Sequence, residues 1–188
     1  MTLVGNLGRL ILAVVLYVGM TLPGGANDML IDDFRTQPEQ RWRYFADTVM
    51  GGVSTGTVSF LLEDGDSFAR MTGRVSTANN GGFIQMRIDL REAPARDSQG
   101  IRLIVRGNDQ RYYLHLRTSG TLLPWQYYQG GFDVTGRWTE FRLPFTAFQA
   151  SGRMLRRTPK PESIRSIGVV AYGRDHDAAI DVLEIGLY

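Results

Sequence analysis

Short runs of alternating apolar and polar residues recur along the chain, and they predict strands. In one such run Ile84, Met86, Ile88 and Leu90 fall on one face, and Gln85 and its neighbours fall on the other. A period of two places one face of a strand in a core and leaves the other face in water. Beyond the N-terminal segment, no stretch shows a convincing helical period. The pattern therefore predicts an all-β protein.

Comparable runs cover most of the chain. Strands are expected over residues 30–34, 57–61, 68–75, 83–90, 100–107, 111–118, 125–134, 138–143, 164–172 and 179–188. The turn Gly107-Asn108-Asp109-Gln110 predicts that residues 100–118 form a hairpin. Gly73 indicates a bulge within its strand, and residues 145–148 indicate one helical turn. Glycine-containing turns at roughly ten-residue spacing favour a β-sandwich or jelly roll.

The composition narrows the functional classes. The 188 residues are enough for one domain with a full hydrophobic core. A formal charge of +2 gives no sign of a nucleic-acid partner. The absence of cysteine excludes disulfides, thiolate zinc sites and cysteine nucleophiles. No cofactor motif is present, so we expect none to bind.

The N-terminus has the pattern of a secretory signal. Arg9 is followed by an apolar run from Leu10 to Val18, and Gly24-Gly25-Ala26 offers small residues for cleavage. The run is shorter than the ~20 residues of a membrane-spanning helix. We therefore expect residues 1–26 to be a signal peptide and residues 27–188 to form a single β-sandwich domain outside the cytoplasm, periplasmic or secreted. An uncleaved N-terminal anchor is the alternative.

Two segments with paired glycines, residues 47–54 and 79–83, form the first candidate site. We call them the glycine-pair loops. Paired glycines permit positive φ and close backbone approach. We expect the two loops to lie together as one rigid surface, with Asp47 and Asn80 accepting backbone N–H groups and with Met50 and Phe83 packed beside them. The candidate partner- or ligand-binding residues here are Asp47, Met50, Gly51, Gly52, Ser54, Asn80, Gly81, Gly82 and Phe83.

Four segments together resemble the complex I intermediate-associated protein 30 family. They are residues 47–54 (Asp-Thr-Val-Met-Gly-Gly-Val-Ser), 80–83 (Asn-Gly-Gly-Phe), 100–107 and 138–145, the last closed by Phe148. Residues 164–168 resemble the family's penultimate strand. The resemblance covers residues 30–188 and implies a galactose-binding-like jelly roll. It also implies a non-enzymatic role in assembling a respiratory or photosynthetic membrane complex, with subunits of such a complex as protein partners.

Carbohydrate binding is the alternative function. Sugar sites combine an aromatic ring with fixed polar groups. The candidate rings are Tyr113, Trp125, Tyr127 and Trp138, and the candidate polar groups are Gln85, Arg87, His115 and Glu140. Burial of the same aromatic residues between two sheets is the competing interpretation.

Catalysis and metal binding have weaker sequence support. Residues 52–56 match the pattern of a nucleophile elbow around Ser54, but a strand rather than a helix is expected to follow. No pair of carboxylates suggests a glycosidase. A structural calcium ion held by Asp32, Asp33 or Glu184 is a further alternative to hydrogen-bonded acids in turns. The basic residues of 153–161 can attract an anionic partner or form a solvated loop.

Overall fold

The computed structural model describes residues 28–188. The expected signal peptide over residues 1–26 lies outside this range. Every strand of the fold falls between Met29 and Leu187. Within the described residues no helix is long and apolar enough to cross a membrane.

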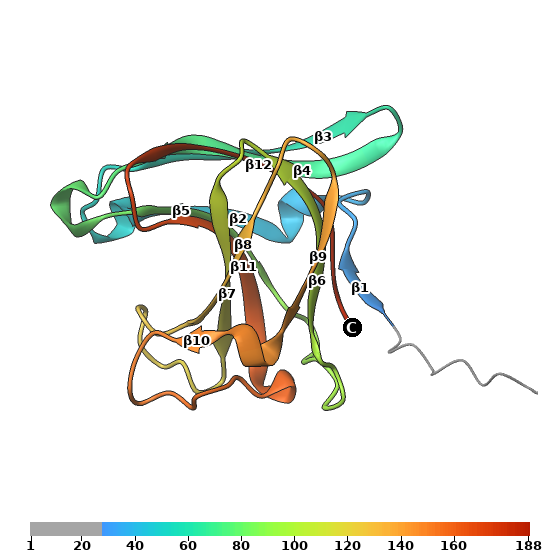
Figure 1. The fold of residues 1–188 in the computed structure, drawn as a ribbon, viewed down its shortest axis with the longest axis vertical. Coiled ribbons are helices and arrows are strands. Elements are labelled where there is room, and N and C mark those ends of the chain that lie inside the picture. The colour runs from blue at the N-terminus through green and yellow to red at the C-terminus, as the bar shows by residue number, and fades with distance from the viewer. Residues whose placement is uncertain (1–27) are drawn as a thin grey trace, which may run out of the picture.

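Twelve strands form two antiparallel sheets that face each other (Figure 1). Sheet A has the order β3-β4-β12-β6-β9, and β1 pairs with the last residues of β12. Its strands are β1 (Met29–Asp32), β3 (Thr55–Glu63), β4 (Asp66–Val75), β6 (Gly100–Gly107), β9 (Thr139–Pro144) and β12 (His176–Leu187). Sheet B has the order β10-β8-β7-β11-β5-β2. Its strands are β2 (Trp42–Ala46), β5 (Phe83–Asp89), β7 (Arg111–Thr118), β8 (Tyr128–Asp133), β10 (Gln149–Ala150) and β11 (Ile164–Tyr172). The predicted all-β sandwich of the jelly-roll type is confirmed.

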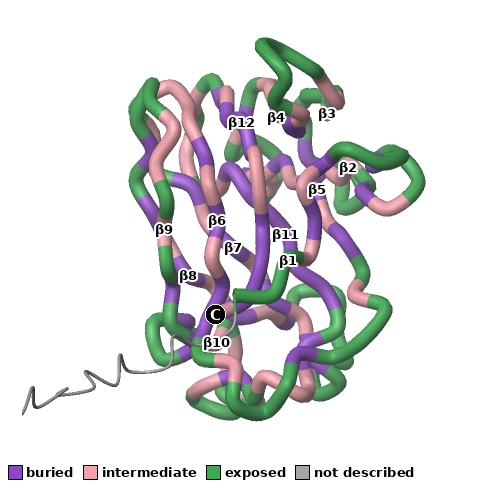
Figure 2. The backbone as a smooth tube through the Cα atoms, turned by 90° about the vertical axis from the view of Figure 1, so that its right-hand side faces the viewer, coloured by how far each residue is buried: buried purple, intermediate pink, exposed green. Residues whose placement is uncertain are grey.

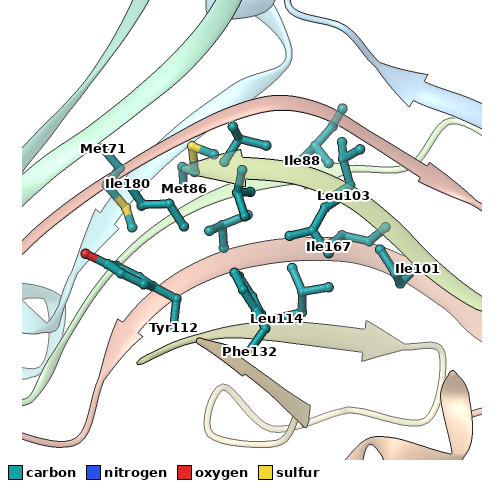
Figure 3. Close-up of a cluster of buried hydrophobic side chains, with 14 of the residues drawn as sticks. Met71, Met86, Ile88, Ile101, Leu103, Tyr112, Leu114, Phe132, Ile167 and Ile180 are labelled. Carbon is teal, nitrogen blue, oxygen red and sulfur yellow. The ribbon is translucent and has the colours of Figure 1, made fainter. Parts of the chain in front are cut away.

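The core lies between the sheets, where the apolar faces of the alternating strands meet (Figure 3). Met86 of sheet B and Leu103 of sheet A are both fully buried, as is Leu114. Figure 2 shows buried residues along the strands and exposed residues in the connecting loops. In β5, β6 and β7 the period-two pattern thus predicted correctly which face is apolar and inward.

The predicted hairpin over residues 100–118 is wrong, because β6 belongs to sheet A and β7 to sheet B. Both edges of β6 are occupied, by β12 and by β9. At the end of β6 the Gly107 N–H donates to Thr135 O and the Asn108 N–H to Ala179 O. These bonds hold the chain at a corner where it crosses to the other sheet. Alternation along a strand carries no information about which strand it pairs with.

Two smaller expectations had different outcomes. Gly73 is not at a bulge, because β4 keeps an unbroken register with β3 and with β12. Glycine is required at position 73 because a Cβ there would collide with the backbone of Thr55 and Gly56. The helical turn near residue 145 is confirmed as the 3-10 helix η4 (Phe145–Ala147). The other short helices are η1 (Pro38–Gln40), η2 (Asp47–Met50), η3 (Ala78–Asn80) and η5 (Pro161–Ser163).

Candidate functional site

The carboxylate of Asp47 joins the two glycine-pair loops. Asp47 is fully buried at the start of η2. Its Oδ1 accepts the Ser54 N–H at 2.9 Å, and its Oδ2 accepts the Gly82 N–H at 2.5 Å and the Phe83 N–H at 3.2 Å. The two loops therefore lie together, as predicted. We call this buried arrangement the Asp47 knot, which consists of Asp47, Ser54 and the N–H groups of Gly82 and Phe83.

Ser54 extends the knot to a third segment. Its hydroxyl donates to Asp47 Oδ2 at 2.5 Å, and its Oγ accepts the Ser76 N–H at 2.9 Å. Burial by itself raises the pKa of Asp47, but the hydrogen bonds from Ser54, Gly82 and Phe83 outweigh burial and hold the pKa below its ordinary value. The side chain is therefore an ionised acceptor that fixes three loops, and Ser54 is 1% exposed.

The glycines of the knot act in two different ways. Gly51 and Gly82 have positive φ, of 88° and 127°. Gly52 and Gly81 do not, and glycine is required there because a Cβ at either position would overlap the Asp47 side chain. Their role is to let the backbone approach the carboxylate closely.

Other expectations for these loops fail. In the part of the chain that the structure describes, the Asn80 side chain accepts no hydrogen bond from a backbone N–H group. The Asn80 backbone instead takes a left-handed conformation with φ 58°. Met50 does not pack beneath the loops, because it is 59% exposed. It lies with Val49 and Val53, which are 72% and 47% exposed, on the outside of the same segment. A rigid turn thus presents three apolar side chains to solvent.

The outer face of sheet B carries a second group of polar and aromatic side chains. Strand pairing places one residue from each of the six strands of sheet B in a single row across the sheet. These are Arg43, Arg87, Gly168, His115, Gln129 and Gln149. Gly168 lies in the middle of this row, where a Cβ would sit 3.0 Å from Oε1 of Gln85. We call this surface the sheet B row.

Aromatic rings cluster beside the row. The ring of His115 stacks on Tyr127 at 4.0 Å between centroids, and Tyr172 meets both rings and Tyr113 edge-on. The Tyr127 hydroxyl donates to that of Tyr172 at 3.2 Å. Burial lowers the pKa of His115 to about 4, although its hydrogen bond with Gln129 opposes this effect. His115 is therefore neutral at physiological pH and serves as a planar, uncharged member of the cluster.

The remaining candidate residues do not join this face. Trp138 and Glu140 lie on the outer face of sheet A, where Arg106 covers the Trp138 ring at 4.5 Å and Glu140 pairs with Arg102 and Arg142. Trp125 is 63% exposed in the loop that follows β7. The predicted ring and polar groups are thus divided between the two sheets. Gly168, Gln129 and Tyr172 were missed, although the alternation of β11 places Tyr172 on the outer face.

The three acids suggested for calcium do not form a site. Asp32 is buried and accepts hydrogen bonds from Arg41 and Trp42. Glu184 pairs with Arg102 at 2.8 Å, whereas Asp33 accepts the Arg35 N–H. Among residues 28–188 no group of three or more such side chains could hold a metal ion. The calcium alternative finds no support in these three residues, because arginines and backbone N–H groups already satisfy their carboxylates.

The described residues thus form a two-sheet antiparallel β-sandwich of the jelly-roll type. Solved structures of the same architecture include the family 11 carbohydrate-binding module from Clostridium thermocellum in complex with a β-1,3-1,4-mixed-linked tetrasaccharide, with a TM-score of 0.68 and 13% identity over 85% of this chain and 94% of that one. The family 11 module of the cellulase Lic26A-Cel5E from the same organism matches with a TM-score of 0.69 and 13% identity, over 85% and 93% of the two chains. An exo-β-agarase matches with a TM-score of 0.57 and 9% identity, over 85% of this chain and 25% of that enzyme.

The sequence itself identifies the family. The model of the complex I intermediate-associated protein 30 family matches residues 33–182. The chain therefore belongs to this family, and the resemblance inferred from the four segments is confirmed. No curated protein matches the chain in sequence.

Proposed function

We propose that this protein is an exported, non-enzymatic binding factor of the assembly type, which contacts a protein partner through the surface fixed by the Asp47 knot. One observation carries the proposal: Val49, Met50 and Val53 are exposed on a turn whose geometry is set by a fully buried carboxylate. Exposed apolar groups on a rigid support are typical of a protein-binding surface, because little conformational entropy is lost on association.

The family supports a partner in a membrane respiratory complex. Its name refers to association with intermediates of complex I. The proposal that the protein is not an enzyme rests on Ser54, because its hydroxyl is buried and donates to Asp47 rather than to a histidine. Export rests on the N-terminal pattern alone, and N-terminal sequencing of the protein from its native cell should give Asn27. A retained Met1 in the membrane fraction would contradict cleavage after Ala26 and favour the uncleaved anchor.

Affinity capture with a tagged chain tests the protein-binding proposal. Quantitative mass spectrometry should recover subunits of a membrane respiratory complex. The double variant Met50→Ser/Val53→Ser should reduce this recovery by roughly thirtyfold, which is the effect of losing a hot spot of about 2 kcal/mol. Leu62→Ser is the matched control, because Leu62 is 71% exposed but lies in the distant β3–β4 hairpin. Equal recovery with both variants would refute the proposal.

The sheet B row supports a second candidate function, carbohydrate binding. Planar polar side chains flank Gly168, and Tyr113, Tyr127 and Tyr172 lie beside them. Rings combined with fixed polar groups are what a sugar requires, and structures of the same fold are carbohydrate-binding modules. A glycan array including mixed-linked β-glucans should give a signal that Tyr113→Ala abolishes and Met50→Ser/Val53→Ser preserves. The opposite pattern of sensitivity would exclude the row as the sugar site.

A further inference from the structure

The loops after β7 and after β10 lie side by side at one end of the sandwich (Figure 1). Ser151 connects them, since its N–H donates to Tyr127 O at 2.9 Å and its hydroxyl donates to Trp125 O at 3.0 Å. In return the Tyr127 N–H donates to the Ser151 Oγ at 3.0 Å. Residues 119–127 and 151–160 therefore form one continuous surface.

Large apolar side chains project from this surface. Leu122 is 82% exposed, Met154 is 88% exposed and Trp125 is 63% exposed, with Leu123 at 39%. Leu122 and Met154 are the two most exposed large hydrophobic residues among residues 28–188, and neither loop belongs to the Asp47 knot or to the sheet B row. Exposed apolar side chains of this size on two adjoining loops indicate a surface that a membrane or another molecule covers.

The first loop is held in this shape by its own polar contacts. Arg117 donates to the carbonyl oxygens of Thr121, Leu123 and Pro124 at 3.1–3.2 Å. Gln126 is buried and its Oε1 accepts the Leu123 N–H at 3.0 Å. Exposure of the apolar residues is thus a consequence of a fixed backbone, and no rearrangement is needed to present them.

Positive charge is concentrated on the second loop. The second loop carries Arg153, Arg156, Arg157 and Lys160, all of which are exposed. Neither residues 119–127 nor residues 151–160 contain an acid. The nearby loop over residues 90–99 carries two arginines, Arg91 and Arg96, and two acids, Glu92 and Asp97, so it leaves this excess of positive charge unchanged.

We propose that these two loops dock the protein on an anionic lipid surface. Leucine, methionine and tryptophan side chains enter the boundary between headgroups and acyl chains, where tryptophan is enriched. Arginine and lysine lie at the headgroup level, with their stems along the apolar region and their charges on the phosphates. Leucine and methionine offer no stacking surface for bases, so the same charges fit a membrane better than a nucleic acid.

This inference is independent of the proposed function, because it involves none of the residues of the knot or the row. It also differs from anchoring by residues 1–26, so the test uses the chain from Asn27 onward, which contains every strand of the fold. Four charges near an anionic surface should strengthen binding roughly a thousandfold relative to a neutral surface of zwitterionic lipid at low salt. Salt should weaken the binding through screening.

Sedimentation with phosphatidylcholine vesicles, with and without phosphatidylglycerol, measures the affinity. Fluorescence quenching by brominated lipids reports the position of Trp125, because Trp42 is buried and Trp138 lies on sheet A under Arg106. We expect binding only to the anionic vesicles, together with strong quenching. Arg153→Gln/Arg156→Gln/Arg157→Gln should weaken binding roughly a hundredfold.

The apolar contribution has its own variant and control. Leu122→Ser/Met154→Ser should abolish the quenching and most of the binding. The controls Leu62→Ser, in β3, and Arg137→Gln, in the loop between β8 and β9, should match the wild type. Thermal melts check that each variant is folded. The proposal is overturned if anionic vesicles do not bind, if the loop variants bind like the controls, or if a labelled oligonucleotide binds through these arginines while vesicles do not.

Discussion

Replacing Asp47 by asparagine tests whether the knot determines the structure of the glycine-pair loops. Asparagine has nearly the same shape but one acceptor oxygen, so its NH₂ group must face either the Ser54 N–H or the N–H groups of Gly82 and Phe83. A hydrogen bond to a charged group contributes about 1.5–3 kcal/mol. Losing at least one such bond and adding a donor–donor contact should lower the free energy of unfolding by about 3 kcal/mol.

Urea unfolding at neutral pH measures this loss directly. In thermal unfolding the same change should lower Tm by roughly 6–12 °C for a domain of this size. Asp133→Asn is the control, because the Asp133 side chain is 71% exposed and pairs only with Arg111 on the surface. Its expected effect is below about 0.5 kcal/mol. If Asp47→Asn were as mild as the control, the reasoning about the knot would be refuted.

The pH dependence separates charge from shape. The pKa of Asp47 is lowered in the folded protein. Its stabilising contribution is therefore complete above the unfolded value of about 3.9 and is lost as pH falls through the lower folded pKa. The difference between the wild type and Asp47→Asn should shrink when unfolding is repeated near pH 3, roughly in that window. A difference of constant size would assign the effect to packing.

Three further outcomes follow from the same contacts. Gly81→Ala should destabilise the fold by more than about 2 kcal/mol, since its Cβ would overlap Asp47, whereas Gly152→Ala meets open space and should be within about 0.5 kcal/mol in the same urea assay. Below pH 6.5 the unfolded chain binds a proton at His115 that the folded chain does not bind, because burial lowers the pKa of His115 to about 4. The free energy of unfolding should therefore fall by about 3 kcal/mol between pH 6.5 and about 4, and His115→Gln should remove most of this loss. Trp138→Ala should lower stability by about 2 kcal/mol through the lost packing beneath Arg106, with glycan binding and partner recovery unchanged.

The sequence was informative about single strands and less informative about their partners. Alternation placed Met86, Leu103 and Leu114 in the core correctly, because the period depends only on local geometry. It could not assign β6 and β7 to different sheets, since strand pairing is decided by contacts far apart in the chain. The same limitation placed Trp138 and Tyr113 in one expected site, although they lie on opposite sheets.

The glycine-pair loops show how a correct prediction can rest on an incomplete reason. Paired glycines and a nearby acid were enough to predict that the two loops meet. Paired glycines were expected to permit positive φ and close backbone approach, and Gly52 and Gly81 serve the second purpose, because the Asp47 carboxylate occupies the space of a side chain. That requirement depends on an acid 34 residues from Gly81, so local turn chemistry does not reveal it.

The segments that identify the family belong mainly to the scaffold. Residues 47–54 and 80–83 build the knot, and residues 100–107 and 138–145 form β6, β9 and the start of η4 in sheet A and its edge. The exposed loops at 119–127 and 151–160 lie outside the family segments, and so does the sheet B row except for Gly168, which ends the segment 164–168. A chain can therefore keep the whole family pattern and still change the row and these loops, whereas the exposed Val49, Met50 and Val53 lie within residues 47–54 and belong to the pattern itself. Family membership accordingly determines the architecture, and the choice between protein, sugar and membrane depends on the side chains of these surfaces.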